Sequence, residues 1–264
     1  MVPTEQEHLL ELQAIDVIWG PQRLLQNISL QVSLREIIGI IGPNGAGKTT
    51  LMNVIIGQIA PTRGRILYQG RDITAWPPHR RCREGIARTF QIPRPFADMT
   101  AWENVAIASS FGRAGRTENF VRPEAMPYLE LVGLGHKAKT LGKDLTLSEQ
   151  RRLEVARALA TEPKLLLLDE VAAGLSPKMV QQVAALVEKL RQQGLTLLII
   201  DHFLNLTLEV ADRLLVLDRG EKIMEGPPQE IMHHPEVVGA YLGTRRAAKG
   251  AGKATEPSEP ANQP

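Results

Sequence analysis

Short apolar runs alternate with helical patterns along most of the chain. Residues 37–41 form a continuous apolar run of the kind expected of a buried parallel strand, and similar runs cover residues 165–168 and 195–200. Helical patterns follow the first two runs, most clearly over residues 177–193, where a proline occupies the first helical position. This alternation predicts an α/β fold with a mostly parallel sheet covered on both faces.

Two regions depart from the alternation. Residues 9–34 carry apolar side chains at roughly every second position, which predicts short strands of a separate, smaller sheet. Residues 92–160 contain several helical patterns and no buried strand, so we expect a helical subdomain inserted into a core of residues 1–91 and 161–244. Residues 245–264 are rich in Ala, Gly, Lys, Pro and Glu and predict a disordered tail. The expected helices of the insert are 100–109, 123–132 and 148–159.

A basic segment lies between these regions. Two prolines, Pro77 and Pro78, open a short helix that holds Arg80, Arg81 and Arg83, and we interpret its charge as a solvated face. The following residues, 86–91, read as a strand with Gln91 as its last residue.

Residues 42–50, GPNGAGKTT, match G-x-x-x-x-G-K-[ST], the phosphate-binding loop. The apolar run before them and the helical pattern after them supply the strand and helix that this motif requires. Glycines let the backbone wrap a phosphate chain, and the start of the helix adds partial positive charge. Lys48 is expected to reach the β- and γ-phosphates, and the Thr49 hydroxyl to ligate Mg²⁺. The predicted contacts with the nucleotide are Gly42, Asn44, Gly45, Gly47, Lys48, Thr49 and Thr50.

Polar side chains follow the other predicted strands. Asp169 and Glu170 end one apolar run, His202 follows another, and Gln91 ends a third strand. Strand ends of an open α/β sheet converge on one ligand crevice. Asp169 therefore suits a carboxylate associated with Mg²⁺, Glu170 suits the residue that polarises an attacking water, and Gln91 is placed to contact the γ-phosphate. The alternative is an acidic strand end that caps the next helix.

Composition narrows the class of protein. The chain has 264 residues, 43% hydrophobic and 23% charged, which is ordinary for a globular protein. A net charge of +2 does not favour nucleic acid as the main partner, and the single cysteine, Cys82, rules out an intrachain disulfide and argues against zinc or iron–sulfur clusters. The N-terminus lacks a secretory signal pattern, and no apolar run reaches the ~18 residues of a membrane span.

Five phrases carry a resemblance to a known family: GPNGAGKTT, RTFQ, QRRLEVARAL, DEVAAGLSP and EVVGAYLG. Over residues 9–243 the chain resembles ATP-binding subunits of ABC transporters, and more narrowly those of branched-chain or hydrophobic amino-acid importers. The resemblance implies a P-loop NTPase (RecA-like) core with a mostly parallel sheet, an antiparallel β subdomain and an inserted helical subdomain. It also implies an ATPase that uses ATP and Mg²⁺.

The resemblance assigns further roles. Trp19 takes the position that stacks on adenine, although core or turn packing is the simpler interpretation of the residue alone. Gln91 becomes a ligand of Mg²⁺ as well as a γ-phosphate contact, Glu170 the general base, and His202 the residue that stabilises transition-state charge. The implied partners are a second ABC ATPase in a homodimer or heterodimer, integral membrane permease subunits and, indirectly, a solute-binding protein. The implied location is peripheral, at the cytoplasmic face of the inner membrane.

Two family motifs depart from their usual sequence. The LSGGQ motif corresponds to residues 145–149, Leu-Thr-Leu-Ser-Glu, here called the signature segment. Thr146 keeps a hydroxyl, but Leu147 and Ser148 replace both glycines. Thr146 and Ser148 remain the predicted contacts with a nucleotide bound to a partner subunit. Hydrolysis is still expected, and the two replacements leave its rate open. Ser176 stands where an acid is usual, which is expected to affect communication between subunits.

Other functions remain open on the sequence alone. A lipid or lipopolysaccharide exporter ATPase is an alternative, as is a soluble, non-transport ABC ATPase. A catalytically weak, mainly structural subunit is a third possibility because of the altered signature segment. A GTPase is disfavoured because the chain lacks an N-K-x-D motif.

Overall fold

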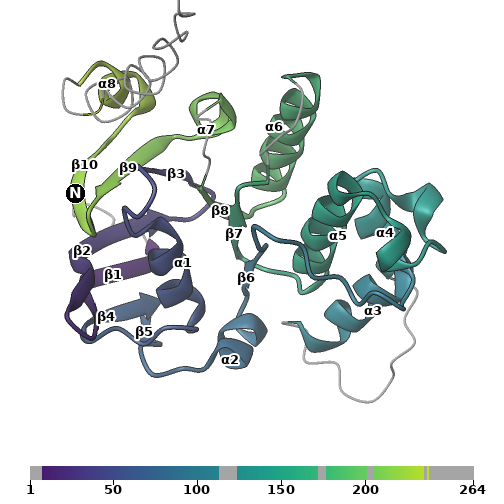
Figure 1. Ribbon diagram of the computed structural model, residues 1–264, viewed down its shortest axis with the longest axis horizontal. Helices are drawn as coiled ribbons and strands as arrows, with labels where there is room; N and C mark the ends of the chain where they lie inside the picture. The colour runs from purple at the N-terminus through teal and green to yellow at the C-terminus, as the bar shows by residue number, and fades with distance from the viewer. Residues whose placement is uncertain (1–7, 113–123, 172–176, 201–204, 235–236, 238–264) are drawn as a thin grey trace, which may run out of the picture.

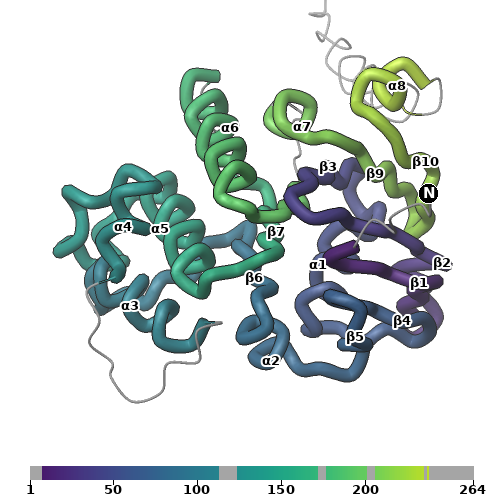
Figure 2. Tube along the Cα trace, turned by 180° about the vertical axis from the view of Figure 1, so that it is seen from behind, coloured from purple at the N-terminus to yellow at the C-terminus, as the bar shows by residue number. Residues whose placement is uncertain are grey.

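The computed structural model describes residues 8–112, 124–171, 177–200, 205–234 and 237. The predicted tail, residues 245–264, lies outside this part of the chain. Figure 1 shows two β-sheets and their helices in one lobe, with α3, α4 and α5 in a second lobe beside it. The same arrangement is seen from behind in Figure 2.

The larger sheet has six strands in the order β10-β9-β3-β8-β7-β6. Strands β6, β7, β8, β3 and β9 pair in parallel, and β10 pairs antiparallel with β9. The predicted mostly parallel sheet is therefore confirmed. Its strands are β3 (Ile37–Ile41), β6 (Ile86–Arg88), β7 (Leu165–Asp169), β8 (Thr196–Ile200), β9 (Arg213–Asp218) and β10 (Glu221–Gly226).

The smaller sheet is antiparallel, in the order β2-β1-β4-β5. Its first two strands have twelve residues each and are longer than the short strands predicted. Register shifts near Ala14, which has a φ of 49°, let the long strands bend while they remain paired. The strands are β1 (His8–Trp19), β2 (Gln22–Ser33), β4 (Arg63–Tyr68) and β5 (Arg71–Asp72).

Helices cover the sheets and build the second lobe. The expected helices of the insert are present as α3 (Ala101–Phe111), α4 (Ala125–Leu131) and α5 (Leu147–Ala160). Two short 3₁₀ turns, Gly135–Lys137 and Gly142–Asp144, connect α4 to α5. The remaining helices are α1 (Lys48–Ile56), α2 (Pro78–Arg83), α6 (Pro177–Gln192), α7 (Asn205–Val210) and α8 (Pro228–His233).

The large sheet separates two hydrophobic cores, one packed against each of its faces. In β8, Leu198 and Ile200 pack in one core, with α1 and the small sheet. Leu197 and Ile199, on the opposite face of the same strand, pack in the other core, with α6 and the helices of the second lobe. Alternate side chains of a strand point to opposite faces, so a continuous apolar run is what a strand buried on both faces requires.

The interpretation of the α2 arginines as a solvated face is wrong for Arg81. This side chain is 1% exposed and donates hydrogen bonds to four backbone carbonyls, those of Val54, Ile55, Thr74 and Trp76. The first two belong to the last turn of α1, where helix carbonyls lack partners within the helix. Arg80 and Arg83, by contrast, are exposed. The hydrogen bonds of Arg81 thus hold α2 against the last turn of α1.

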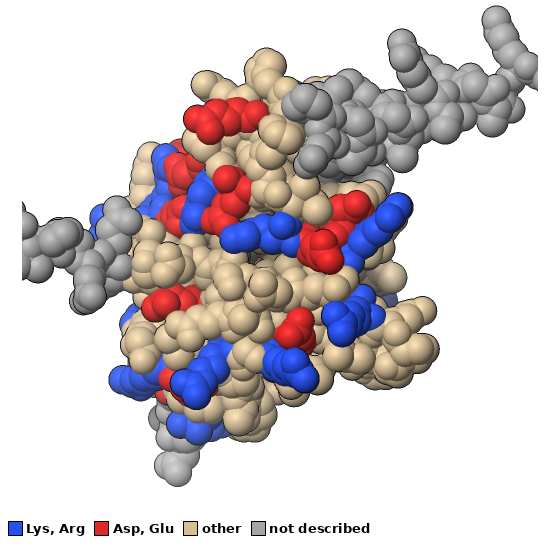
Figure 3. All heavy atoms as spheres, turned by 90° about the vertical axis from the view of Figure 1, so that its left-hand side faces the viewer, with Lys and Arg blue, Asp and Glu red and all other residues tan. Residues whose placement is uncertain are grey.

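The surface carries charges of both signs. Figure 3 shows basic and acidic side chains interspersed on the side of the molecule where β2 and β10 lie. Within the described part of the chain, no helix is long and apolar enough to cross a membrane.

Candidate functional site

The loop between β3 and α1 has the backbone of a phosphate cradle. A Cβ added at Gly42 would lie 2.1 Å from the Leu217 carbonyl oxygen, and Gly47 has a φ of 103°, which favours glycine. The helix α1 begins at Lys48 with no acidic residue in its first turn. Its N-terminal N–H groups and partial positive charge therefore face the loop unopposed by acid within that turn.

Lys48 lies folded into this loop. Its Nζ atom donates hydrogen bonds to the carbonyl oxygens of Gly42, at 2.7 Å, and Pro43, at 2.9 Å. Burial lowers the pKa of the Lys48 ammonium, and the nearby carboxylates of Glu170 and Asp169 oppose this shift. The loop thus holds a desolvated cation on carbonyl oxygens that phosphate oxygens can replace.

Two further loop residues present polar atoms outward. The side chains of Asn44 and Thr49 are exposed, and Thr49 lies in the first turn of α1. Their position at the mouth of the loop leaves the amide and the hydroxyl accessible to a ligand.

Asp169 is the last residue of β7 and is held by Arg88, the last residue of β6. Arg88 Nη2 lies 2.6 Å from Asp169 Oδ2, with side chains 5% and 3% exposed, and its Nη1 donates to the Asn53 side chain on α1. The Asp169 N–H also donates to the Thr89 hydroxyl, at 3.1 Å. The roles of Arg88 and Asn53 were not predicted from the sequence. An arginine within a short, otherwise apolar strand was the available signal.

Glu170 follows Asp169 in a left-handed conformation, with a φ of 50°. Its N–H donates to the Ile200 carbonyl of β8, at 3.0 Å, and its Oε2 accepts a hydrogen bond from Gln91 Nε2, at 2.8 Å. A non-glycine residue in this conformation is costly and tends to occur at functional sites. The adjoining strands and Gln91 thus fix the direction of this carboxylate.

Gln91 does not end a strand. The prediction is wrong here, because β6 ends at Arg88 and Gln91 lies three residues beyond it, with an exposed side chain. The chain after β6 brings the Gln91 side chain to Glu170. Since Gln91 donates through its amide nitrogen, its amide oxygen is left to accept or to ligate a cation.

The donor set suits a hard cation. The Thr49 hydroxyl, the Asp169 carboxylate and the Gln91 amide oxygen are oxygen donors of the type Mg²⁺ prefers. Arg88 engages Oδ2 of Asp169, which leaves Oδ1 for another partner. The residues present therefore fit a magnesium ion bound together with phosphate oxygens.

Comparison with known proteins decides the family. A family model described as "ABC transporter" matches residues 25–173, more than half of the chain. The chain belongs to the ABC transporter family. A second model, described as "Branched-chain amino acid ATP-binding cassette transporter", matches residues 221–247. Since members of this family hydrolyse ATP, the phosphate loop and the acidic strand end belong to an ATPase.

Relatives of this cassette cover nearly its whole length. It is 38% identical to the high-affinity branched-chain amino acid transport ATP-binding protein BraF of Pseudomonas aeruginosa, over 89% of this chain and 98% of the relative. It is 36% identical to LivG, a protein of the same description from Escherichia coli, with the same coverage. It is also 38% identical to the lipopolysaccharide export system ATP-binding protein LptB of Acidithiobacillus ferridurans, over 89% and 97%.

Solved structures support the fold class. The crystal structure of the ADP conformation of an ATP-binding cassette of an ABC transporter superposes with a TM-score of 0.80 at 32% identity, covering 89% of this chain and 99% of that one. The α/β cassette with an antiparallel sheet and a helical lobe is therefore the architecture expected of the family.

Trp19 ends β1 at the tip of the β1–β2 hairpin. It is 69% exposed, and the next residue, Gly20, has a φ of 57° that turns the chain toward β2. The alternative that Trp19 packs in the core is therefore excluded. The β2 strand of this hairpin adjoins the cassette's phosphate loop, since a Cβ on Gly47 would lie 2.8 Å from a methyl carbon of Leu25.

The signature segment of the cassette is at the start of α5, in the second lobe (Figure 1). Thr146 is the N-cap residue, and the Leu147 side chain is 58% exposed. The structure brings Lys48, Asp169, Glu170 and Gln91 to one region but does not bring Thr146 or Ser148 to the phosphate loop of the same chain. His202 and Ser176 lie outside the described residues.

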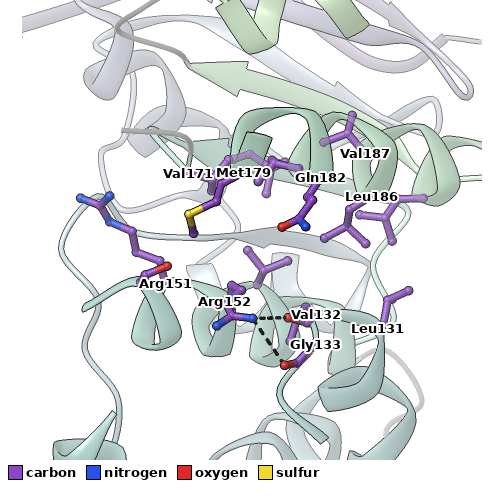
Figure 4. Close-up of a pocket in the computed structure, with 15 residues that line it drawn as sticks. Leu131, Val132, Gly133, Arg151, Arg152, Val171, Met179, Gln182, Leu186 and Val187 are labelled. Carbon is purple, nitrogen blue, oxygen red and sulfur yellow. Dashed lines mark hydrogen bonds between the residues drawn. The ribbon is translucent and has the colours of Figure 1, made fainter. Parts of the chain in front are cut away.

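An apolar hollow of about 540 Å³ separates α5 from α6 (Figure 4). Val171, Met179 and Leu186 line one side, and Ser148 of the signature segment also belongs to its lining. Arg152 of α5 donates hydrogen bonds to the backbone carbonyls of Val132, at 3.3 Å, and Gly133, at 3.4 Å. This hydrogen bonding ties α5 to the end of α4, while the hollow lies on the side toward α6.

Proposed function

We propose that the chain is the ATP-binding and ATP-hydrolysing subunit of an importer for branched-chain or other hydrophobic amino acids. The observation that supports hydrolysis most directly is the orientation of Glu170 by Gln91, beside Asp169 and facing the region of Lys48. Support for the substrate class is the match to the branched-chain cassette model and the similarity to BraF and LivG.

In the proposed mechanism the phosphate loop binds ATP through Gly42, Asn44, Gly45, Gly47, Lys48, Thr49 and Thr50. Trp19 stacks on the adenine. Glu170 takes a proton from a water molecule, and the oxygen of that water attacks the γ-phosphorus as the bond to ADP breaks. His202 stabilises the charge that develops on the transferred group. Thr49, Asp169 and Gln91 would hold Mg²⁺, which would supply positive charge against the phosphate oxygens.

A complete site needs a second ATPase subunit. Its signature segment would contact the γ-phosphate held by this chain, and Thr146 and Ser148 of this chain would serve the partner's nucleotide. Integral membrane permease subunits would dock near Gln91 and the segment after it, which places the protein peripherally on the cytoplasmic face of the inner membrane. A solute-binding protein would act indirectly. Residues 92–160 would form the helical unit between the permease and the core. The tail after residue 244 would be dispensable for folding and ATP binding.

A lipopolysaccharide-type exporter ATPase is the second candidate, because LptB matches with the same 38% identity as BraF. The chain's native membrane partners distinguish the two. An importer predicts co-purification with permease chains and a solute-binding protein that binds a branched-chain amino acid. Co-purification with an exporter complex instead would replace the importer assignment.

The variant Glu170→Gln tests hydrolysis. It should bind ATP as tightly as the wild type, lose turnover by at least about 100-fold, and accumulate an ATP-bound dimer. Phosphate release and sedimentation velocity measure the two effects. Exposed Glu221→Gln in β10 is the matched control and should keep normal turnover. Normal turnover of Glu170→Gln would show that another residue is the base.

A further inference from the structure

Arg88 occupies one of the two oxygens of the Asp169 carboxylate. Its Nη2 donates to Asp169 Oδ2 at 2.6 Å, and the two side chains are only 5% and 3% exposed. A hydrogen bond between two charged groups is among the strong ones, and burial shields this one from competing water. Oδ1 is therefore the oxygen that Asp169 has left for a metal ion.

Further contacts fix the direction of this pair. Arg88 Nη1 donates to the Asn53 side chain on α1, and the Phe90 ring lies beside the guanidinium, with 5.4 Å from Cζ to the ring centroid. The Asp169 N–H donates to the Thr89 hydroxyl, which holds the backbone of the carboxylate. Guanidinium donors point in a rigid fork, so anchoring one nitrogen orients the other. Asp169 cannot turn both oxygens toward one ion without breaking its contact with Arg88.

A carboxylate limited to one oxygen distinguishes between two common divalent cations. Mg²⁺ demands near-octahedral geometry and keeps several waters, whereas Ca²⁺ takes more oxygen ligands and accepts both oxygens of one carboxylate. The other expected ligands, the Thr49 hydroxyl and the Gln91 amide oxygen, supply one oxygen each. The donor set thus offers few oxygens at fixed positions, which suits Mg²⁺ and penalises Ca²⁺.

We propose that Arg88 is a positioning residue that selects Mg²⁺ over Ca²⁺ at the ATP site by reserving one oxygen of Asp169. This inference rests on the proposed function, in which Thr49, Asp169 and Gln91 hold the metal ion that accompanies ATP. Arg88 acts through Asp169 and touches neither the metal nor the nucleotide. A purely structural role for Arg88 would change the affinities for both cations by the same factor.

Displacement of Mn²⁺ measures this selectivity without relying on turnover. The full chain carries Glu170→Gln, which prevents hydrolysis, and is kept in excess over ATP. Electron paramagnetic resonance follows Mn²⁺ bound to the protein–ATP complex. Titration with Mg²⁺ or with Ca²⁺ gives a dissociation constant for each cation, and the ratio of the two constants is the selectivity. Thermal melting verifies that each variant is folded.

Substitutions of Arg88 test the contact directly. Arg88→Met should reduce the preference for Mg²⁺ over Ca²⁺ at least about tenfold, the size of effect typical when a metal ligand loses its hydrogen-bond partner. Arg88→Lys keeps a cation that can donate to Oδ2, so its selectivity should stay within about threefold of the parent.

Two further variants separate selectivity from stability. Asn53→Ala removes the anchor of Arg88 and places a strong helix former in α1, so this variant is expected to fold even if Arg88→Met does not. Its selectivity should fall about two- to fivefold, because Arg88 is held less firmly. Arg81→Met is the matched control. Arg81 is also a buried arginine bound to α1, but at the last turn of the helix, so its loss should leave the selectivity within about twofold of the parent.

The outcomes separate this inference from the proposed function. An unchanged ratio in Asn53→Ala, and in Arg88→Met where that variant folds, would refute the role of Arg88 alone. The same loss of selectivity in Arg81→Met would also overturn the inference, since it would show a general effect of a weakened fold. If the parent protein binds Mn²⁺ with ATP no more tightly than ATP does by itself, the proposed metal ligands are wrong and the inference fails with them.

Discussion

Each charged side chain near the phosphate loop is held by a different contact. Carbonyl oxygens of the loop hold Lys48, Arg88 holds Asp169, and Gln91 holds Glu170. These contacts come from residues on β6, the loop after it and the loop before α1. Contacts within the chain therefore orient these side chains, which reduces the reorganisation needed for catalysis.

Replacing Lys48 by alanine should abolish ATP binding. The loop would lose the cation that reaches the phosphates, and a charge-assisted contact of this kind is worth at least about 3 kcal/mol, or a hundredfold in affinity. Isothermal titration with Mg²⁺–ATP measures the loss. Lys189→Ala, on the exposed side of α6, is the control and should bind normally. Unchanged affinity of Lys48→Ala would refute the phosphate-loop assignment.

Replacing Arg88 by methionine should destabilise the fold by about 3–5 kcal/mol, because it leaves the buried Asp169 carboxylate without its partner. Urea unfolding measures this change in the free energy of unfolding. The double variant Arg88→Met with Asp169→Asn should lose less than the sum of the two single losses, since the residues interact directly. Additive losses would show that the buried pair is not coupled.

The residues of the phosphate loop were predictable because their spacing is a local motif. Arg88 and Asn53 were not, because their contacts join segments far apart in the chain: Arg88 and Asp169 are separated by 81 positions. Only the parallel pairing of β6 with β7 brings them together. Periodicity identifies the two strands but not which side chain at their ends will be paired.

At the scale of elements, the strength of the pattern decided what could be predicted. The continuous apolar runs became β3, β7 and β8 at nearly the expected bounds. The end of β6 was misplaced because Thr89, Phe90 and Gln91 follow Arg88 without a glycine or proline to mark the end of the strand. The short helix α8 was missed, since six residues with one buried side chain, Ile231, leave little periodic signal.

The contact between α1 and α2 provides a test at this scale. Burial lowers the pKa of Arg81 to about 10, and the side chain satisfies four carbonyls in return. Arg81→Met should destabilise the fold by about 3–5 kcal/mol, because buried acceptors lose a charged donor. Arg83→Met, on the exposed side of α2, should change the free energy of unfolding by less than about 0.5 kcal/mol. Urea unfolding compares the two, and equal effects would contradict a fastening role for Arg81.

At the scale of the whole molecule, the layers followed from the alternation of strands and helices, but the position of the signature segment did not. The sequence contains the motifs expected of an ATP site, whereas the fold separates α5 from the phosphate loop. Under the proposed function a complete site would belong to an assembly, and the geometry of that assembly would depend on surface residues rather than on the periodicity of the core.

The large sheet packs in a hydrophobic core on each face, and this affects how the molecule unfolds locally. A strand such as β8 cannot lose its packing on one face without loosening the other, so the sheet should exchange its amide hydrogens as one cooperative unit. Leu197→Ala and Leu198→Ala, which face opposite cores, should each cost about 2–5 kcal/mol and accelerate exchange across β3, β7 and β8 alike. Leu129→Ala in α4 should accelerate exchange mainly in the second lobe. Hydrogen–deuterium exchange measured by mass spectrometry tests this prediction. If exchange became faster only in the helices on one face of the sheet, the two cores would unfold locally and independently of each other.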